Sequence, residues 1–157
     1  MAYRRMVPIA IHCAPVADID PQTLYRILWL RVSVFVVEQQ AAYAELDGRD
    51  IEPGAELAWI EDSDQVVSTL RILCEPTEMR IGRVATSPGA RGLGHSARLM
   101  RLAIGRCAEL RPTAPILLDA QTHLSEWYGR FGFAQSGEPF VEDDIPHIPM
   151  RRAGTSD

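Results

Sequence analysis

The chain has 157 residues, 46% of them hydrophobic, and this length suits one domain with a core of its own. It contains no lysine, so its 16 basic residues are all arginines, which excludes a Walker-type phosphate lysine and a Schiff-base lysine. The net charge of −5 argues against general nucleic-acid binding, and no run of about 18 apolar residues predicts a membrane span.

The first predicted helix begins at Pro21, with Asp20 as its N-cap, because apolar residues follow at helical spacing as far as about residue 38. Its last part, "VSVFVV", is rich in β-branched residues and is also typical of a strand. Residues 56–75 predict a hairpin, since two apolar runs flank the polar turn "EDSDQ". The next strand, "MRIGRVAT", is predicted to end before Ser87 and Pro88.

The second half of the chain continues this alternation. Residues 95–110 predict a helix followed by Pro112, and the apolar "PILLDA" predicts a buried central strand. "HLSEWYGRFGF" predicts a short helix that closes at Gly132, and "AQSGEPF" and "HIPMRR" predict weaker strands. The last few residues are expected to fray. Together the elements predict one mixed α/β domain over residues 1–157.

Charge is distributed unevenly along the chain. Residues 38–64 carry nine acids and one cation, whereas residues 79–108 carry six arginines and no acid. The connection "SPGARGLGHS" lies within the basic stretch, between a predicted strand and a predicted helix. Such a connection points backbone N–H groups and the positive end of the helix at one spot, which favours a phosphate. The alternative, glycines that only shape a turn, fits the surplus of arginines less well.

The residue types in this connection suit an anion. Gly92 and Gly94 allow close approach of the backbone, Arg91 adds a charge, and Ser96 has a hydroxyl to donate. A dinucleotide-binding motif matches weakly, because Ala97 replaces its third glycine.

The run Arg91-Gly92-Leu93-Gly94-His95-Ser96 resembles the acetyl-CoA pyrophosphate signature of GNAT N-acetyltransferases, which reads Gln or Arg, two residues, Gly, one residue, then Gly or Ala. Ser96 departs from the last position but is small enough for a close helix start. "WYGRFGF" resembles the second signature, a tyrosine on a short helix before Gly-Phe. "RVSVFVVEQQAAYAELDGRD", "LDAQTHLSEWYGRFGF" and "VEDDIPHIPM" look like the ElaA-like branch. The resemblance spans roughly residues 20 to 152.

This resemblance implies a GNAT fold, an α/β (α+β) domain with a twisted, mixed, mostly antiparallel sheet flanked by helices. It also implies transfer of an acyl group, expected to be acetyl, from acetyl-CoA directly to an amine, without a metal. A bulge in the strand before the loop would let its backbone bind the pantetheine arm. The residues expected to contact the cofactor are Val84, Ala85, Thr86, Arg91, Gly92, Leu93, Gly94, His95, Ser96, Gln121 and His123.

The chemistry needs a proton donor for the departing thiolate and an acceptor for the amine proton. With the family resemblance Tyr128 is the expected acid, whereas without it the favoured interpretation is a core aromatic. Glu38, at the end of the first helix, is the first choice of base, Glu45 and Asp47 come next, and His147 is a further candidate for base or acceptor contact. For any one of these acids a solvated surface carboxylate is the alternative. Glu45, Asp47 and His147 are expected at the acceptor site, where an acidic lip would attract a cationic amine.

Two other functions remain open. The chain could be a non-catalytic acyl-CoA-binding module that senses the cofactor, which would need neither Tyr128 nor a base. It could also be a nucleotide-binding or protein-interaction domain whose arginines meet an acidic partner. As an enzyme it would take a small-molecule amine or a peptide or protein amine, with no nucleic-acid or membrane partner, and a homodimer is one option for its assembly.

The compartment is indicated by the cysteines. Cys13, Cys74 and Cys107 are odd in number, widely spaced and without a Cys-x-x-Cys pair, which favours buried reduced thiols over a disulfide framework or a zinc site. The apolar run near the N-terminus is only a few residues long and predicts no signal peptide. We therefore expect a cytoplasmic protein.

Overall fold

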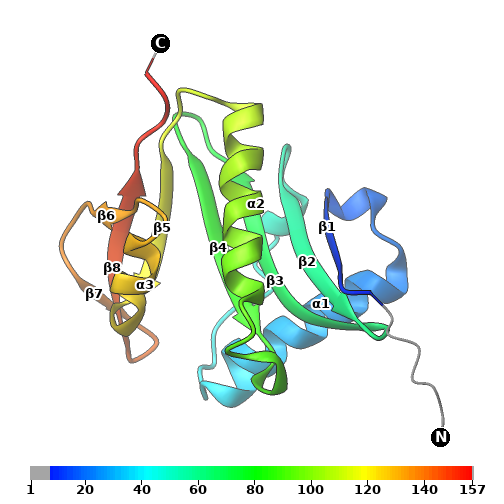
Figure 1. The fold of residues 1–157 in the computed structure, drawn as a ribbon. Coiled ribbons are helices and arrows are strands. Elements are labelled where there is room, and N and C mark those ends of the chain that lie inside the picture. Colours follow the sequence, from blue (N-terminus) through cyan, green and yellow to red (C-terminus); the bar gives the residue numbers. More distant parts are fainter. Residues whose placement is uncertain (1–7, 157) are drawn as a thin grey trace, which may run out of the picture.

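The computed structural model describes residues 8–156 (Figure 1). Residues 1–7 and residue 157 lie outside the described range, and so does most of the N-terminal stretch in which no signal peptide is predicted. Its helices are α1 (Pro21–Val32), α2 (His95–Leu110) and α3 (Ser125–Gly129). Its strands are β1 (Ala10–Ala14), β2 (Glu56–Asp62), β3 (Gln65–Cys74), β4 (Met79–Thr86), β5 (Ile116–Gln121), β6 (Ala134–Gln135), β7 (Phe140–Glu142) and β8 (Ile145–Arg152).

The strands form one sheet in the order β1-β2-β3-β4-β5-β8-β6, with β7 also paired to β8. The β4–β5 pair is parallel and the other pairs are antiparallel, so the expected mixed, mostly antiparallel sheet is confirmed. Helix α2 packs on one face and α1 on the other (Figure 1). No helix within residues 8–156 has the length and apolar character needed to cross a bilayer.

Helix α1 begins as predicted. The Asp20 carboxylate accepts hydrogen bonds from the backbone N–H groups of Gln22 and Thr23, both at 3.1 Å, and Pro21 is the first helical residue. The ambiguous "VSVFVV" is helical, because α1 continues as a π-helix over Ser33–Glu38 and buries Val34. π-helical turns are rare and frequently mark functional sites. The residue after the segment, Gln39, lines the cleft described below.

Strand β1 is absent from the sequence-based prediction, which places no element before the first helix. It pairs along its whole length with β2, from Ala10 opposite Glu61 to Ala14 opposite Leu57. His12 also stacks on Trp59, with ring centroids 5.1 Å apart. The strand is short and its pairing partner lies more than forty residues away, so nothing local marks it.

The sheet splits between β4 and β5. Their pairing is limited to Met79 with Ile116 and Arg80 with Leu117, after which the strands diverge (Figure 1). Strand β4 also bulges against β3, where the register shifts, and Arg83 there takes a left-handed φ of 52°. Past Arg80, the edge of β4 that faces β5 carries no partner strand among the described residues.

The C-terminal residues pack on the connection between α2 and β5. The backbone N–H of Thr155 donates to the carbonyl of Pro112 at 2.9 Å, and Gly154 lies so close to Thr113 that a Cβ would overlap its carbonyl oxygen. This part of the chain is therefore held, although the sequence analysis expects the last few residues to fray.

Candidate functional site

A cleft of about 660 Å³ opens where β4 and β5 part. One wall comes from the end of α1 and the loop after it, including Phe35, Gln39 and Tyr43, and the floor comes from β4. The opposite wall comes from β5, α3 and the β7–β8 hairpin. A pocket between splayed strands at the carboxyl ends of a sheet is a usual place for a ligand.

Tyr128 projects from α3 to the cleft. It is 7% exposed and meets Trp127 edge-on, with ring centroids 4.9 Å apart. Burial raises the pKa of Tyr128 to about 12, and no residue in the described range 8–156 hydrogen-bonds its hydroxyl. The phenol is therefore protonated at neutral pH and able to donate to a group in the cleft.

The bulged half of β4 supplies backbone to the cleft. Val84 lines it, while the side chain of Ala85 is buried under α1. Thr86 ends the strand, and its hydroxyl is bonded to Ser68 at 2.8 Å and to Ser96 at 2.6 Å. The Ser96 hydroxyl is thus committed to the strand end, and it ties the start of α2 to β4.

The loop before α2 has the form of an anion site. Gly92 and Gly94 take left-handed φ values of 79° and 81°, and a Cβ on either would meet open space, so conformation rather than crowding requires glycine. Gly94 is the N-cap and provides no side-chain cap, so the first N–H groups of α2 are left for another acceptor. Leu93 is 67% exposed beside them. These donors fit a phosphate group.

Glu38 and Arg91 lie together at this loop. Both Nη atoms of Arg91 donate to the Glu38 carboxylate, at 2.6 and 2.7 Å, and its Nε donates to the carbonyl of Thr86 at 3.1 Å. The hydrogen bond from Arg91 lowers the pKa of Glu38, which makes this carboxylate a weaker base. Glu38 does not line the cleft, so the two residues expected to play separate roles are partners at the loop.

His95 turns inward at the start of α2. Its side chain is 4% exposed, and neither ring nitrogen has a hydrogen-bond partner among the described residues. Only its backbone N–H can serve an anion at the loop.

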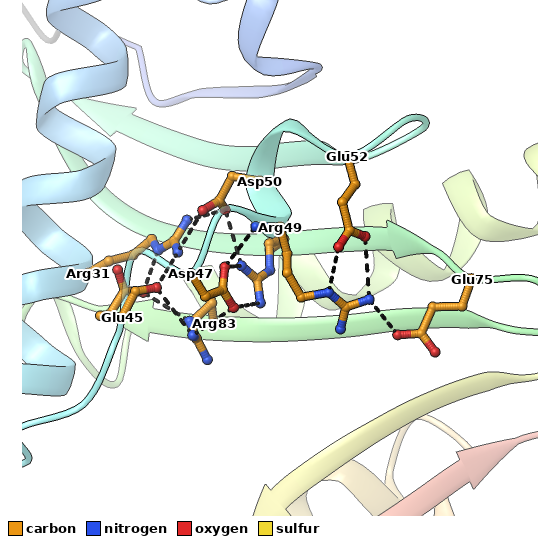
Figure 2. A network of polar contacts seen from close by, with 9 residues as sticks. Arg31, Glu45, Asp47, Arg49, Asp50, Glu52, Glu75 and Arg83 are labelled. Atoms are coloured by element: carbon orange, nitrogen blue, oxygen red, sulfur yellow. Dashed lines mark hydrogen bonds and ion pairs between the residues drawn. The ribbon is translucent and has the colours of Figure 1, made fainter.

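The acids expected at the acceptor site meet arginines (Figure 2). Glu45 is 3% exposed and contacts Arg31 at 2.7 Å and Arg83 at 3.0 Å. Asp47 lines the cleft and pairs with Arg71 at 2.8 Å and with Arg83 at 3.2 Å. Burial alone would raise the pKa of Asp47, but hydrogen bonds from Arg71 and from a backbone N–H hold it at about 2. The two acids therefore fasten the loop to the sheet and carry little uncompensated charge.

The three remaining predicted residues are divided between the cleft and the surface. Gln121 lines the cleft, and its Nε2 donates to Oε1 of Gln39 at 3.3 Å across the opening. His147 also lines the cleft, with Nδ1 2.7 Å from the carbonyl of Ile145. Because a carbonyl only accepts, Nδ1 carries the proton and Nε2 of the neutral ring is an acceptor. His123 is exposed and is not part of the cleft wall.

Four acids that line the cleft were missed by the sequence analysis, and two of them, Glu75 and Asp119, pair with Arg80. Glu142 and Asp143 lie on the β7–β8 hairpin and line the wall opposite α1, and neither forms an ion pair within the described residues. Their signal was the acidic run inside "VEDDIPHIPM", of which only His147 was considered. They supply negative charge that no arginine neutralises.

The described side chains also bear on two further kinds of chemistry, metal binding and thiol catalysis. Within residues 8–156, no three His, Cys, Asp or Glu residues are grouped in a way that could hold a metal ion. The cysteines in the same range are free thiols. Burial raises the pKa of Cys13 and of Cys107 to about 12, so both are weak nucleophiles at neutral pH.

Comparisons with known proteins agree over nearly the whole chain. The profile of the acetyltransferase (GNAT) domain matches residues 17–153. The chain is 43% identical over 143 residues to a UPF0039 protein of Mycobacterium tuberculosis, covering 88% of this chain and 89% of that protein. It is 37% identical over 141 residues to protein ElaA of Escherichia coli, covering 87% and 91%.

Two solved structures are similar throughout. A crystal structure of an acyl-CoA N-acyltransferase from Pseudomonas aeruginosa superposes with a TM-score of 0.89 at 40% identity, over 93% of this chain and 100% of that one. The crystal structure of Escherichia coli ElaA gives a TM-score of 0.88 at 34% identity, over 92% and 99%.

Proposed function

We propose, from the premise that the chain belongs to the GNAT acetyltransferase family and to its ElaA-like branch, that it transfers an acetyl group from acetyl-CoA directly to an amine. The family itself comprises acyl-CoA-dependent N-acyltransferases. The acetyl donor, the direct transfer and the residue roles below are the proposed parts. The observation that carries them is a cleft with an unpaired β4 edge, an uncapped start of α2 near that strand's end, and the protonated Tyr128 in its wall.

Acetyl-CoA would bind along β4. Its pyrophosphate would accept hydrogen bonds from the N–H groups at the start of α2 and from Arg91. Its pantetheine arm would pair with the free edge of β4 at residues 84–86, as an added strand does. This arrangement would direct the thioester to the bulge at Arg83, in the cleft that Tyr128 also lines.

In the reaction, the amine nitrogen forms a bond to the thioester carbonyl carbon, and the carbon–sulfur bond then breaks. A backbone N–H at the bulge would stabilise the oxyanion. Tyr128 would donate to the departing sulfur. Since its pKa of about 12 exceeds that of an alkyl thiol, about 8.5, complete transfer is uphill. Tyr128 therefore acts as a hydrogen-bond donor to the departing sulfur, which leaves as a thiolate and takes up its proton from water.

The amine must lose its own proton. We expect it to pass to Nε2 of His147, directly or through water, because His147 lines the cleft while Glu38 is held outside it by Arg91. Glu142 and Asp143 would draw a cationic acceptor, either a small-molecule amine or a peptide or protein amine, to the same opening. The free cysteines of the described residues favour a cytoplasmic setting.

Replacement of Tyr128 by phenylalanine tests the catalytic role. Tyr128→Phe is expected to lower kcat by about 10- to 1000-fold with little change in acetyl-CoA affinity, because the donor is lost and the ring is kept. The readout is thiol release with the best acceptor from a panel of amines. Tyr25→Phe is the matched control, since Tyr25 is 70% exposed on α1. An unchanged kcat in Tyr128→Phe would remove Tyr128 from the mechanism. A wild type that binds acetyl-CoA but releases no thiol with any amine would favour the non-catalytic sensor.

Replacement of Arg91 by alanine tests the binding role. Arg91→Ala is expected to weaken acetyl-CoA binding by about 1 to 3 kcal/mol in calorimetric titration, the range for a hydrogen bond to a charged group. Arg151→Ala is the control, because Arg151 is exposed on β8 opposite Leu117, at the closed end of the sheet. Parallel titrations with dephospho-CoA and NAD test selectivity, and binding no tighter than that of NAD would favour a general nucleotide-binding domain.

A further inference from the structure

We propose that Glu38 is a displaceable counter-ion, which occupies the phosphate-binding face of Arg91 in the free protein and lowers the affinity for phosphorylated ligands until they displace it. This inference rests on the proposed binding of acetyl-CoA at the loop before α2. It gives Glu38 a role in cofactor binding instead of a role as the catalytic base.

The contact has the geometry that a phosphate would require. Both Nη atoms of Arg91 are bound by the two carboxylate oxygens of Glu38, at 2.6 and 2.7 Å, and these are the two donors that a phosphate group would take. The Nε atom is occupied by the carbonyl of Thr86. With Nε fixed to the strand end, the guanidinium offers one bidentate face, so Glu38 and a phosphate exclude each other there.

The pair is exposed enough to be exchanged. The side chains of Arg91 and Glu38 are 45% and 40% exposed, and exposed ion pairs contribute little because water and salt screen them. The buried pair of Arg31 and Glu45 shows the contrast, with side chains only 1% and 2% exposed. Glu38 is therefore held firmly enough to occupy the site and loosely enough to leave it.

The backbone around Glu38 is unusual in a way that suits movement. Glu38 is the last residue of the π-helix, whose backbone bonds are less favourable than those of an α-helix, and Gln40 two residues later has a left-handed φ of 53°. The next residue, Gln39, bridges to Gln121 across the cleft by one bond of 3.3 Å. Departure of Glu38 from Arg91 thus requires a local adjustment at a segment end, and the α1 core contacts remain.

A double-mutant cycle at Glu38 and Arg91 tests the proposal. CoA affinity is measured by calorimetric titration for the wild type, Glu38→Gln, Arg91→Ala and the double variant. Glu38→Gln is expected to bind CoA about 2- to 10-fold more tightly than the wild type. The same substitution is expected to have no effect once Arg91 is alanine, because the competition acts through that guanidinium. Glu38→Ala must shift affinity in the same direction.

The matched control is Glu109→Gln, which neutralises an exposed acid paired with Arg106 at 3.1 Å near the other end of α2; its CoA affinity should equal that of the wild type. Unchanged affinity in Glu38→Gln would overturn the proposal. Equal tightening with and without Arg91 would also overturn it, since long-range repulsion would then explain the effect. If the wild type binds CoA and Arg91→Ala binds equally well, Arg91 does not bind the phosphate; the proposal then fails together with the role of Arg91, while acyl transfer from bound acetyl-CoA still stands. If the wild type does not bind CoA, the proposed function fails as well.

Discussion

Arg31 is expected to fasten the loop that follows α1 and borders the cleft. Its burial determines how much this contributes to the free energy of unfolding. It is 0% exposed, and its guanidinium bonds to Glu45 at 2.7 Å and to Asp50 at 2.6 Å. Arg31→Met keeps the length of the side chain but leaves these acids short of a partner. Removing one member of a buried ion pair costs about 3 to 5 kcal/mol, which corresponds to a loss of about 6 to 20 °C in Tm for a domain of this size.

The comparison variant is Arg49→Met in the same network (Figure 2). Arg49 pairs with Glu52 at 2.9 Å and with Glu75 at 2.7 Å, but its side chain is 36% exposed. Its loss is therefore expected to cost no more than about 1 kcal/mol. Urea unfolding followed by circular dichroism gives both free energies. Equal, small losses in the two variants would refute the reasoning, because they would mean that burial does not determine the strength of these pairs.

Three further results are expected. His95→Leu should raise the unfolding free energy by about 1 to 2 kcal/mol in urea titration, because it replaces a buried ring without partners among the described residues, and a loss would mean that the ring has a partner. The pKa of Asp47 is about 2, below its usual 3.8, so its pairing stabilises the fold above about pH 4 and less as the pH falls towards 2. The stability gap between the wild type and Asp47→Asn should narrow over that range. Acyl transfer should not decline between pH 8 and 10 through ionisation of Tyr128, whose pKa is about 12; a lost phenolic proton in that range would contradict this.

Local signals determine how much of the fold follows from the sequence. Helix α2 and strand β4 have the predicted bounds, because Gly94 and Pro88 punctuate the chain beside them. The predicted hairpin of β2 and β3 is confirmed as well, because the polar turn between its two apolar runs is also a local signal. Strand β1 could not be predicted, since its formation depends on a distant partner. The helical state of "VSVFVV" depends on the burial of Val34 between α1 and the sheet, in a cluster with residues of β2, β3 and β4, and this burial overrides the β-branched composition.

The site is harder to predict than the fold, because the sequence shows where charged residues lie along the chain but not which of them pair in the structure. The acidic and basic stretches are opposite in sign and partly pair with each other, as Glu38 does with Arg91 and Asp47 with Arg83. Acids that look free in the sequence are therefore neutralised in the fold. Tyr128 could be anticipated because the motif around it is local. The place of Glu142 in the cleft wall could not, and neither could its lack of an ion pair within residues 8–156, since both depend on how the fold positions the arginines.

The seam between β4 and β5 is short, so along most of their length these two strands are joined by side-chain packing in a shared core and not by backbone hydrogen bonds. Two residue pairs, the bond from the Met79 N–H to the carbonyl of Pro115 at 2.9 Å and the 3.3 Å contact between Arg80 and Asp119 join them at one end. A ligand that binds as an added strand would fill the gap between β4 and β5 and would supply the hydrogen bonds that β4 lacks on that side. Binding of such a ligand would then complete the sheet, and the ligand-bound protein would be more rigid than the free protein.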